Sequence, residues 1–425
     1  RHGDATIDER MLTLAGEGIE LPIATDHNTH IDYRDAMRRT ATGRWFTPVI
    51  GNEVTTRVGH FNIFPVTPDA SPPDANLTDW PQLLEAMRRT PGVRVIVLNH
   101  PRSIHSGFRP FDPENFNSVA GEARKSLAFG FDALEVLNSG AQQTDFMRVY
   151  RDWFALLNRG HRIVAVSGSD AHDVSRFIVG QGRTYIAAAD NDPAHIDVDN
   201  ACKNLREGRA FVSMGLLVNL TVNRRFSVGD LVTDQEPVLS VEAEVRGPSW
   251  IKGPTHVALF ANGTQIRETD FLKAIAGPNS AGGLKGRVAW PIPRPRHDIH
   301  LVAIATAPAV DEPFWAMTKP YQPNSIHWQG RAIGSTNPVW IDGDGDGKFS
   351  SARAYAERVV VADTTSIKGM LSLLAEYDEA VAIQAASICQ IRGMDLAAPA
   401  FVSALENAPL AVKNGFVQVR DATKH

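Results

Sequence analysis

Short apolar runs that end in acidic or imidazole side chains recur along the first half of the chain. The first run covers residues 21–28, and three later runs end at Glu53, at His100 and at Asp170, with His172 just beyond. A short buried strand that stops at such residues places them at its carboxyl end, where sheets built from βα units carry their chemistry. A single Asp-His pair is more often a hydrogen-bonded structural pair, but recurrence at successive strand ends favours one shared site.

Strand-like and helical periods alternate through this half. Helices are expected at 8–19, 31–40, 80–89, 119–130, 145–158 and 194–207. Strands are expected at 21–25, 46–50, 58–66, 94–99, 131–138, 162–167 and 182–186. Repeated strand-then-helix units with buried strands predict a parallel, barrel-like α/β domain through about residue 210. The stretch 101–120 is rich in loop-forming residues, and long loops on barrels often cover active sites.

The pattern changes after residue 210. Short alternating strands such as 216–222 and 238–245, with turn signals between them, predict a β-sandwich over 211–335. An Asp/Gly linker and an Ala-rich α-helical tail are expected over 336–425. The predicted fold class is therefore α/β, with a barrel over 1–210, a β-sandwich and a short α-helical tail.

Composition limits the classes of function. The chain has 425 residues, of which 43% are hydrophobic and 21% charged, as in ordinary globular proteins. The net charge of −5 offers no basic footprint for nucleic acid, and no apolar run approaches the ~20 residues of a membrane span. Cys202 and Cys389 lie far apart and support neither a disulfide framework nor a Cys-based zinc site. We therefore expect a small-molecule substrate, with no nucleic acid partner and no membrane span.

The side chains at the strand ends are hard or borderline metal donors. They are His27, Glu53, His60, His100, Asp170 and His172. Such a set suits Zn, Mn or Fe rather than a soft thiolate site. One carboxylate can bridge two ions, and paired ions activate a water and stabilise the charge that develops on an ester or amide oxygen. The alternative is a scatter of unrelated core and surface residues.

These residues stand in motifs that resemble a known superfamily. The motifs are Thr25-Asp-His27, Gly51-Asn-Glu53, Gly59-His60, Asn99-His-Pro101 and Gly168-Ser-Asp-Ala-His172. They look like the successive motifs of the polymerase and histidinol phosphatase (PHP) superfamily, whose members are metallohydrolases on a distorted (β/α)7 barrel with two or three metal ions. The sequence around these motifs resembles one branch of the superfamily, the carbaryl-hydrolase-like metallohydrolases. The matching segments are Glu53-Val-Thr-Thr56, Gly59-His-Phe-Asn62, Asn99-His-Pro-Arg102, Leu156-Leu-Asn-Arg-Gly160 and Asn337-Pro-Val-Trp340. The resemblance covers residues 1 to about 350.

The resemblance implies a role for each matching residue. The metal ligands would be Asp4, His27, Glu53, His60, His100, Asp170 and His172, with Glu53 as the bridge. Asp4 can equally be an acid near a helix amino terminus. The expected catalytic residues are Glu53, Asp170 and Arg102.

Further polar residues would support this centre. Asp26 would orient an imidazole from outside the ligand set. Arg102, and with less support Arg183 and Asn28, would hold an anionic group of the substrate. The alternative for these three is ordinary polar contact at the barrel rim.

Two features complicate the resemblance. The family opens with a His-x-His pair on its first strand, whereas this chain starts at Arg1 and has no such pair, so we expect a truncated sequence. The loop from Asp342 to Gly347 has Ca²⁺-loop spacing, with Asp342, Asp344 and Asp346 as candidate ligands. Its twelfth position is Arg353 where an EF-hand needs a bidentate Glu, so a Gly/Asp turn is the alternative.

The sequence as a whole predicts a metal-dependent hydrolase with a di- or trinuclear cluster. It would cleave a phosphoester or a carbamate, ester or amide bond, in a substrate that is anionic or a carbamate or ester. The alternative is a non-catalytic metal-containing binding or scaffold protein with a degenerate barrel, which the missing His-x-His pair favours and the remaining ligands oppose. Localisation is open, and an appended sandwich favours a periplasmic or secreted protein over a cytoplasmic one only by analogy.

Overall fold

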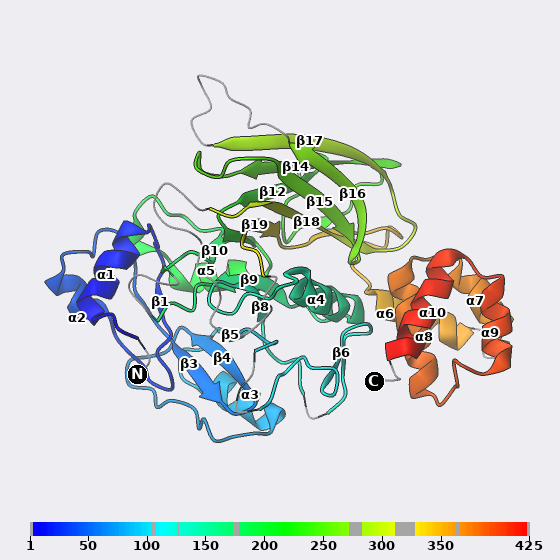
Figure 1. Ribbon diagram of the computed structural model, residues 1–425, viewed down its shortest axis with the longest axis horizontal. Helices are drawn as coiled ribbons and strands as arrows, with labels where there is room; N and C mark the ends of the chain where they lie inside the picture. Colours follow the sequence, from blue (N-terminus) through cyan, green and yellow to red (C-terminus); the bar gives the residue numbers. More distant parts are fainter. Residues whose placement is uncertain are drawn as a thin grey trace.

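A computed structural model describes residues 3–103, 105, 107–125, 127–172, 178–271, 283–310, 328–362 and 366–422. Within these residues the chain is a mixed α/β structure with ten α-helices and several sheets, none of which closes on itself. The α/β part of the predicted fold class is confirmed. Figure 1 shows two strand-rich regions, one above the other, with helices α6 to α10 grouped at one end.

One five-stranded sheet carries most of the predicted site. Its order is β3 (Asn52–Thr56), β4 (Gly59–Phe64), β5 (Val95–Leu98), β8 (Ala133–Asn138) and β9 (Val164–Gly168). β5, β8 and β9 are parallel, whereas β3, β4 and β5 pair antiparallel. The expectation of an all-parallel sheet is therefore wrong for this half. Only Arg57 and Val58 join β3 to β4, and a two-residue link permits antiparallel pairing alone.

A pair of short parallel strands precedes this sheet and leads towards Glu53 on β3. β1 (Ile23–Ala24) pairs with β2 (Val49–Ile50), and the pairing continues as a bridge between His27 and Glu53. The amino-terminal helices are α1 (Ile7–Gly16) and α2 (Arg34–Arg39). Together these short elements bring the segment after β1 alongside β3.

The helices that cover this sheet are α3 (Trp80–Arg89), α4 (Met147–Arg159) and α5 (Val198–Arg206), with a short 3-10 turn, η1, at Pro193–His195. The helix expected over 119–130 is wrong. The described part of that stretch forms turns and β7 (Glu122–Ala123), which pairs with β6 (Phe116–Asn117). Gly121 explains the difference, because its φ is +68° and a Cβ there would lie 2.4 Å from the Ala155 carbonyl oxygen. The backbone packs against α4 in a conformation that a helix cannot adopt.

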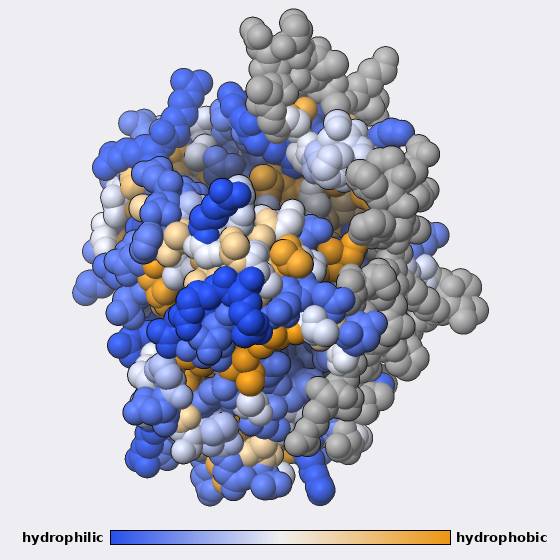
Figure 2. All heavy atoms as spheres, turned by 90° about the vertical axis from the view of Figure 1, so that its left-hand side faces the viewer, coloured by the Kyte–Doolittle hydropathy of each residue, from blue (hydrophilic) through white to orange (hydrophobic). Residues whose placement is uncertain are grey.

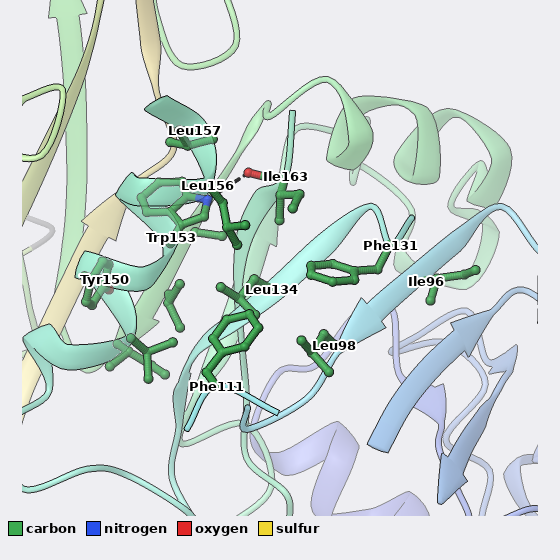
Figure 3. Packing of buried hydrophobic residues seen from close by; sticks show 14 of the residues in the cluster. Ile96, Leu98, Phe111, Phe131, Leu134, Tyr150, Trp153, Leu156, Leu157 and Ile163 are labelled. Atoms are coloured by element: carbon green, nitrogen blue, oxygen red, sulfur yellow. Dashed lines mark hydrogen bonds between the residues drawn. The ribbon is translucent and has the colours of Figure 1, made fainter. Parts of the chain in front are cut away.

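Helix α4 packs against the sheet through large apolar side chains. In Figure 3, Leu98 of β5 and Leu134 of β8 lie beside Phe111, while Trp153 comes from α4 above them. Trp153 is fully buried and its indole N–H donates to the Ile163 carbonyl at 2.8 Å. Burial of such large apolar side chains is the main stabilising term for this part of the fold.

Two further sheets follow. The larger contains β10 (Arg183–Ile186), β11 (Ala210–Met214), β13 (Leu231–Val232), β15 (Thr255–Ala261), β16 (Thr264–Phe271), β18 (Ile299–Pro308), β19 (Arg331–Thr336) and β20 (Val339–Ile341). The smaller contains β12 (Leu217–Val222), β14 (Val238–Arg246) and β17 (Leu284–Pro293). Both sheets contribute to one apolar cluster, with Leu220 and Val241 from one and Leu259 and Leu301 from the other. Because β10 pairs with β11, the larger sheet contains residues from both sides of residue 210, where the predicted barrel ends.

The carboxyl-terminal helices form a group with its own apolar cluster. They are α6 (Ala352–Ala362), α7 (Ile367–Leu374), α8 (Glu379–Ile391), α9 (Pro399–Glu406) and α10 (Leu410–Ala422). The side-chain amide of Gln384 on α8 donates to the Ala120 carbonyl at 3.0 Å, which ties the group to the turn before β7. The helical tail expected from the sequence thus packs on the rest of the chain.

Surface polarity agrees with the composition. The face on the side of α1 and α2 is mostly hydrophilic, with apolar side chains in scattered patches (Figure 2). Among the described helices, none is both long and apolar enough to cross a membrane.

Candidate metal centre

The Glu53 carboxylate, on β3, is the point where the predicted donors meet. Its Oε2 lies 2.8 Å from Nδ1 of His27. Its Oε1 lies 3.1 Å from Nδ1 of His60 and 3.6 Å from Nε2 of His100. These imidazoles come from three segments, namely the turn after β1, the start of β4 and the end of β5. The Glu53 side chain is only 7% exposed, so its negative charge is buried among nitrogen donors.

The imidazoles decide the charge state of this carboxylate. Burial alone would raise its pKa, but hydrogen bonds from His100, His27 and His60 hold the pKa of Glu53 well below its usual range. Burial also opposes protonation of His100, yet the hydrogen bond to Glu53 and the charges of Asp170 and Glu135 raise the pKa of His100 to about 9. The proton on His100 thus balances the buried carboxylate, and a bound cation would displace it.

A second group of donors faces Glu53 Oε2. Nε2 of His27 lies 3.3 Å from Nε2 of His172, so both rings point at the same space. His172 Nδ1 lies 2.9 Å from the Asp170 carbonyl oxygen and 3.5 Å from the Asp170 carboxylate. The backbone N–H of Asp4 donates to the His172 carbonyl at 3.2 Å. Thr6 is the N-cap of α1, and Asp4 precedes it by two residues, so both interpretations of Asp4 stay open.

Backbone conformation is unusual at this site. His100, Asp170 and Asn28 have φ angles of 22°, 50° and 53°, in the left-handed region that non-glycine residues seldom adopt. Such conformations persist where the surrounding structure enforces them, and they concentrate at functional sites. Here they redirect the chain shortly after strands β1, β5 and β9, and at His100 this brings the imidazole to Glu53.

His105 is a site residue that the sequence reasoning missed. Its ring centroid lies 3.9 Å from that of His60 and 5.0 Å from that of His100. Ligand atoms of these three histidines all lie within 4.8 Å of one another. Burial and the neighbouring imidazoles lower the pKa of His105 to about 2, so it is neutral, the form that binds metals. A lone histidine in an irregular loop carries no periodic signal that would have identified it.

Glu135 is a second residue that was missed. Its Oε2 accepts from the His100 backbone N–H at 2.7 Å and from the Asn138 amide at 2.9 Å. Glu135 lines a cavity beside His100 together with Asn138, and burial raises the pKa of its carboxyl to about 7. A charged residue inside the apolar strand 131–138 was the available signal.

The residues expected to support the centre have other partners. The Asp26 carboxylate accepts from the Tyr33 hydroxyl at 3.2 Å, while Thr55 Oγ1 contacts His27 Nδ1 at 2.6 Å. The Asn28 amide donates to the Thr55 carbonyl at 3.0 Å and accepts its backbone N–H at 2.8 Å. Thr55 therefore occupies the orienting position that was expected for Asp26.

The two predicted substrate-binding arginines also have protein partners. The buried Arg102 guanidinium pairs with both carboxylate oxygens of Asp152, at 2.8 and 2.6 Å. Arg183 donates to the carbonyl of Glu17 at 3.0 Å and to that of Gly180. These contacts match the alternative of ordinary polar contacts, and a role in substrate binding stays a prediction.

The Asp/Gly loop forms a different cluster from the one expected. Carboxylate oxygens of Asp298, Asp342 and Asp344 lie within 4.8 Å of one another. Asp346 instead accepts from the Lys348 backbone N–H at 2.8 Å. A Ca²⁺ site at this loop stays a prediction.

No protein-family model, no curated protein and no solved structure matches this chain. The case for a metal at this site therefore depends on the chemistry of the donor side chains. Nδ1 of His100 and Nε2 of His105 are buried and have no hydrogen-bond partner within the described residues. Buried polar atoms are nearly always paired, and a divalent cation would satisfy lone pairs of this kind.

Proposed function

We propose that this chain is a metal-dependent hydrolase of the PHP type. One observation carries the proposal, namely a buried carboxylate, Glu53, in contact with imidazoles from three separate chain segments. The proposed ligands are Asp4, His27, Glu53, His60, His100, Asp170 and His172. Core polar residues ordinarily find one or two partners, so convergence of this kind on one carboxylate favours a metal centre over a structural network.

The proposal includes the finer architecture. We infer that residues 1–210 form the distorted (β/α)7 barrel of that superfamily and that 211–335 form a β-sandwich. Support for the first comes from the parallel strands β5, β8 and β9, whose carboxyl ends face the donors. Support for the second comes from two sheets that share one apolar cluster.

The two carboxylate oxygens of Glu53 divide the donors into two groups. Oε2 faces His27 and, beyond it, His172 with Asp170, whereas Oε1 faces His60 and His100. We infer that Glu53 would bridge two cations, for which Zn, Mn or Fe suit the donors. When bound, such ions activate a water and stabilise the charge that develops on a substrate oxygen.

The arginine contacts bear on the choice of substrate. Arg102 is held by Asp152, and Arg183 by Glu17, so neither guanidinium is placed to pair with a phosphate without losing its present partner. Breaking the buried Arg102 pair would leave an uncompensated charge, at a cost of about 3–5 kcal/mol. We therefore place carbamate, ester or amide cleavage ahead of phosphoester cleavage.

The function is tested on protein reconstituted with Zn²⁺ or Mn²⁺ and offered an aryl carbamate, an aryl ester and an aryl phosphate. We expect metal-dependent hydrolysis that falls by more than about 100-fold in Glu53→Gln, because loss of a direct ligand exceeds the roughly 10–100-fold effect of outer partners. His256→Gln, at an exposed histidine of β15, serves as control and should retain activity. Metal-loaded protein without activity on any substrate would support the scaffold alternative.

A further inference from the structure

We infer that His105 is a metal ligand and that it forms, with His60 and His100, a position with three imidazole donors beside Glu53 Oε1. This inference rests on the proposed function, since it concerns the same centre. It goes further by assigning an additional ligand and by predicting that the two metal positions differ in donor type.

The three rings converge from three elements. His60 stands at the start of β4, His100 directly follows β5, and His105 lies in the loop beyond it. The centroids of His60 and His100 are 5.2 Å apart, and His105 lies 3.9 and 5.0 Å from them. A cation bound between the three rings would have three nitrogen donors within reach, with Glu53 Oε1 next to two of them.

An unpaired nitrogen of His105 points to a ligand rather than to packing alone. His100 and His105 are 7% and 6% exposed, and each has one buried ring nitrogen with no partner among the residues that the structure describes. The unpaired nitrogen of His100 is Nδ1, whereas its Nε2 is the atom beside Glu53 Oε1. A cation at that oxygen would therefore bind His100 through Nε2 and would satisfy the unpaired Nε2 of His105.

The loop holds His105 in position. Its backbone N–H donates to the Phe108 carbonyl at 2.7 Å, and its carbonyl accepts from the Phe108 N–H at 2.9 Å. This pair of hydrogen bonds closes a turn, and Phe108 packs against the main apolar cluster. The imidazole is therefore preorganised, as ligands of tight metal sites are.

The donor types predict which ion each position takes. Three neutral imidazoles are the set of many catalytic Zn²⁺ sites, which keep a further position open. Asp170 contacts His172, and we infer that it belongs with Glu53 Oε2 to the other position, where oxygen donors suit Mn²⁺ or Fe²⁺ better. The three-histidine position should therefore prefer Zn²⁺ or Co²⁺ and should keep its metal when Asp170 is replaced.

The test is titration of the metal-free chain with Co²⁺, in which visible absorption reports ligand geometry and chelator competition reports affinity. His105→Phe keeps the stacked ring but removes both nitrogens, and His105→Gln is a second variant in case the first does not fold. His161→Phe is the control, because His161 is a half-buried histidine whose ring centroid lies 4.9 Å from that of Phe129, away from the centre. None of these readouts depends on hydrolysis.

We expect one Co²⁺ equivalent to bind about 10-fold or more weakly in His105→Phe, with an altered spectrum. Asp170→Asn should retain that equivalent, and His161→Phe should match the parent. Unchanged affinity and spectrum in both His105 variants would overturn the inference and leave the hydrolase proposal standing. A parent chain that binds no Co²⁺ and no Zn²⁺ would overturn both.

Discussion

Replacement of Glu135 by glutamine should change how the stability of the metal-free protein depends on pH. Burial, with a smaller contribution from the charge of Asp170, raises the pKa of this carboxyl from its ordinary value of 4.5 to about 7. The buried group therefore prefers to be protonated, and glutamine reproduces the protonated form without being able to ionise. Its amide oxygen can still accept the His100 N–H, which the carboxylate accepts at 2.7 Å.

The size of the effect follows from the two pKa values. The difference between 4.5 and about 7 corresponds to about 3 kcal/mol, at roughly 1.4 kcal/mol per pH unit. Because the folded-state pKa is raised, the stability that Glu135 contributes is fully present below pH 4.5 and is lost as the pH rises to about 7. Glu135→Gln should thus match the parent at low pH and become more stable than it by about 3 kcal/mol above pH 7.

The assay is urea unfolding of chelator-treated parent and variant at a series of pH values between 5 and 8. The difference between the two proteins reports Glu135 together with its interaction with His100, since titration of shared groups that do not interact with Glu135 cancels. A difference in unfolding free energy that stays constant across this range would refute the reasoning, because Glu135 would then ionise in the fold as it does in water.

Three further substitutions test the packing around the site, each by the free energy of unfolding in urea. Arg102→Ala should cost about 3–5 kcal/mol, because it leaves the Asp152 carboxylate buried and unpaired, and a cost below about 1 kcal/mol would contradict that view. Gly168→Ala should cost about 1–3 kcal/mol, because its Cβ would lie 2.6 Å from Glu135 Oε1, and an unchanged stability would show that this oxygen moves freely. Asn337→Ala should cost about 3 kcal/mol, since the buried amide makes three hydrogen bonds that join β9 to β11, whereas a neutral result would mean that water replaces them.

The sequence predicted the part of the site that follows strand periodicity. His27, Glu53 and His100 were predicted because each stands at or near the end of an apolar run, and His60 because it follows Glu53 within the next strand-like run; strand ends meet in space. His105 escaped because an irregular loop has no period, and its position depends on a turn with Phe108. The pairing of Arg102 with Asp152 also escaped, because the partner lies 50 residues away on α4 and no local pattern links them.

The fold, like the site, could be predicted from the sequence where it follows local periodicity. Helices such as α3 and the approximate positions of most strands in the first half of the chain follow from local periodicity. The antiparallel pairing of β3 with β4 depends on a two-residue link whose meaning was overlooked. The false helix over 119–130 shows the limit of periodicity, because close approach of Gly121 to α4 is a tertiary contact that local composition does not encode.

The most direct test of the metal centre is the metal content per chain, measured by inductively coupled plasma mass spectrometry after reconstitution with Zn²⁺, Mn²⁺ or Fe²⁺. We expect two or more transition-metal equivalents in the parent and fewer in a Glu53→Ala/Asp170→Ala variant that still folds, because Glu53 stands between both groups of donors. A parent that retains no transition metal, or a variant that retains as much as the parent, would contradict the assignment of the centre to these residues.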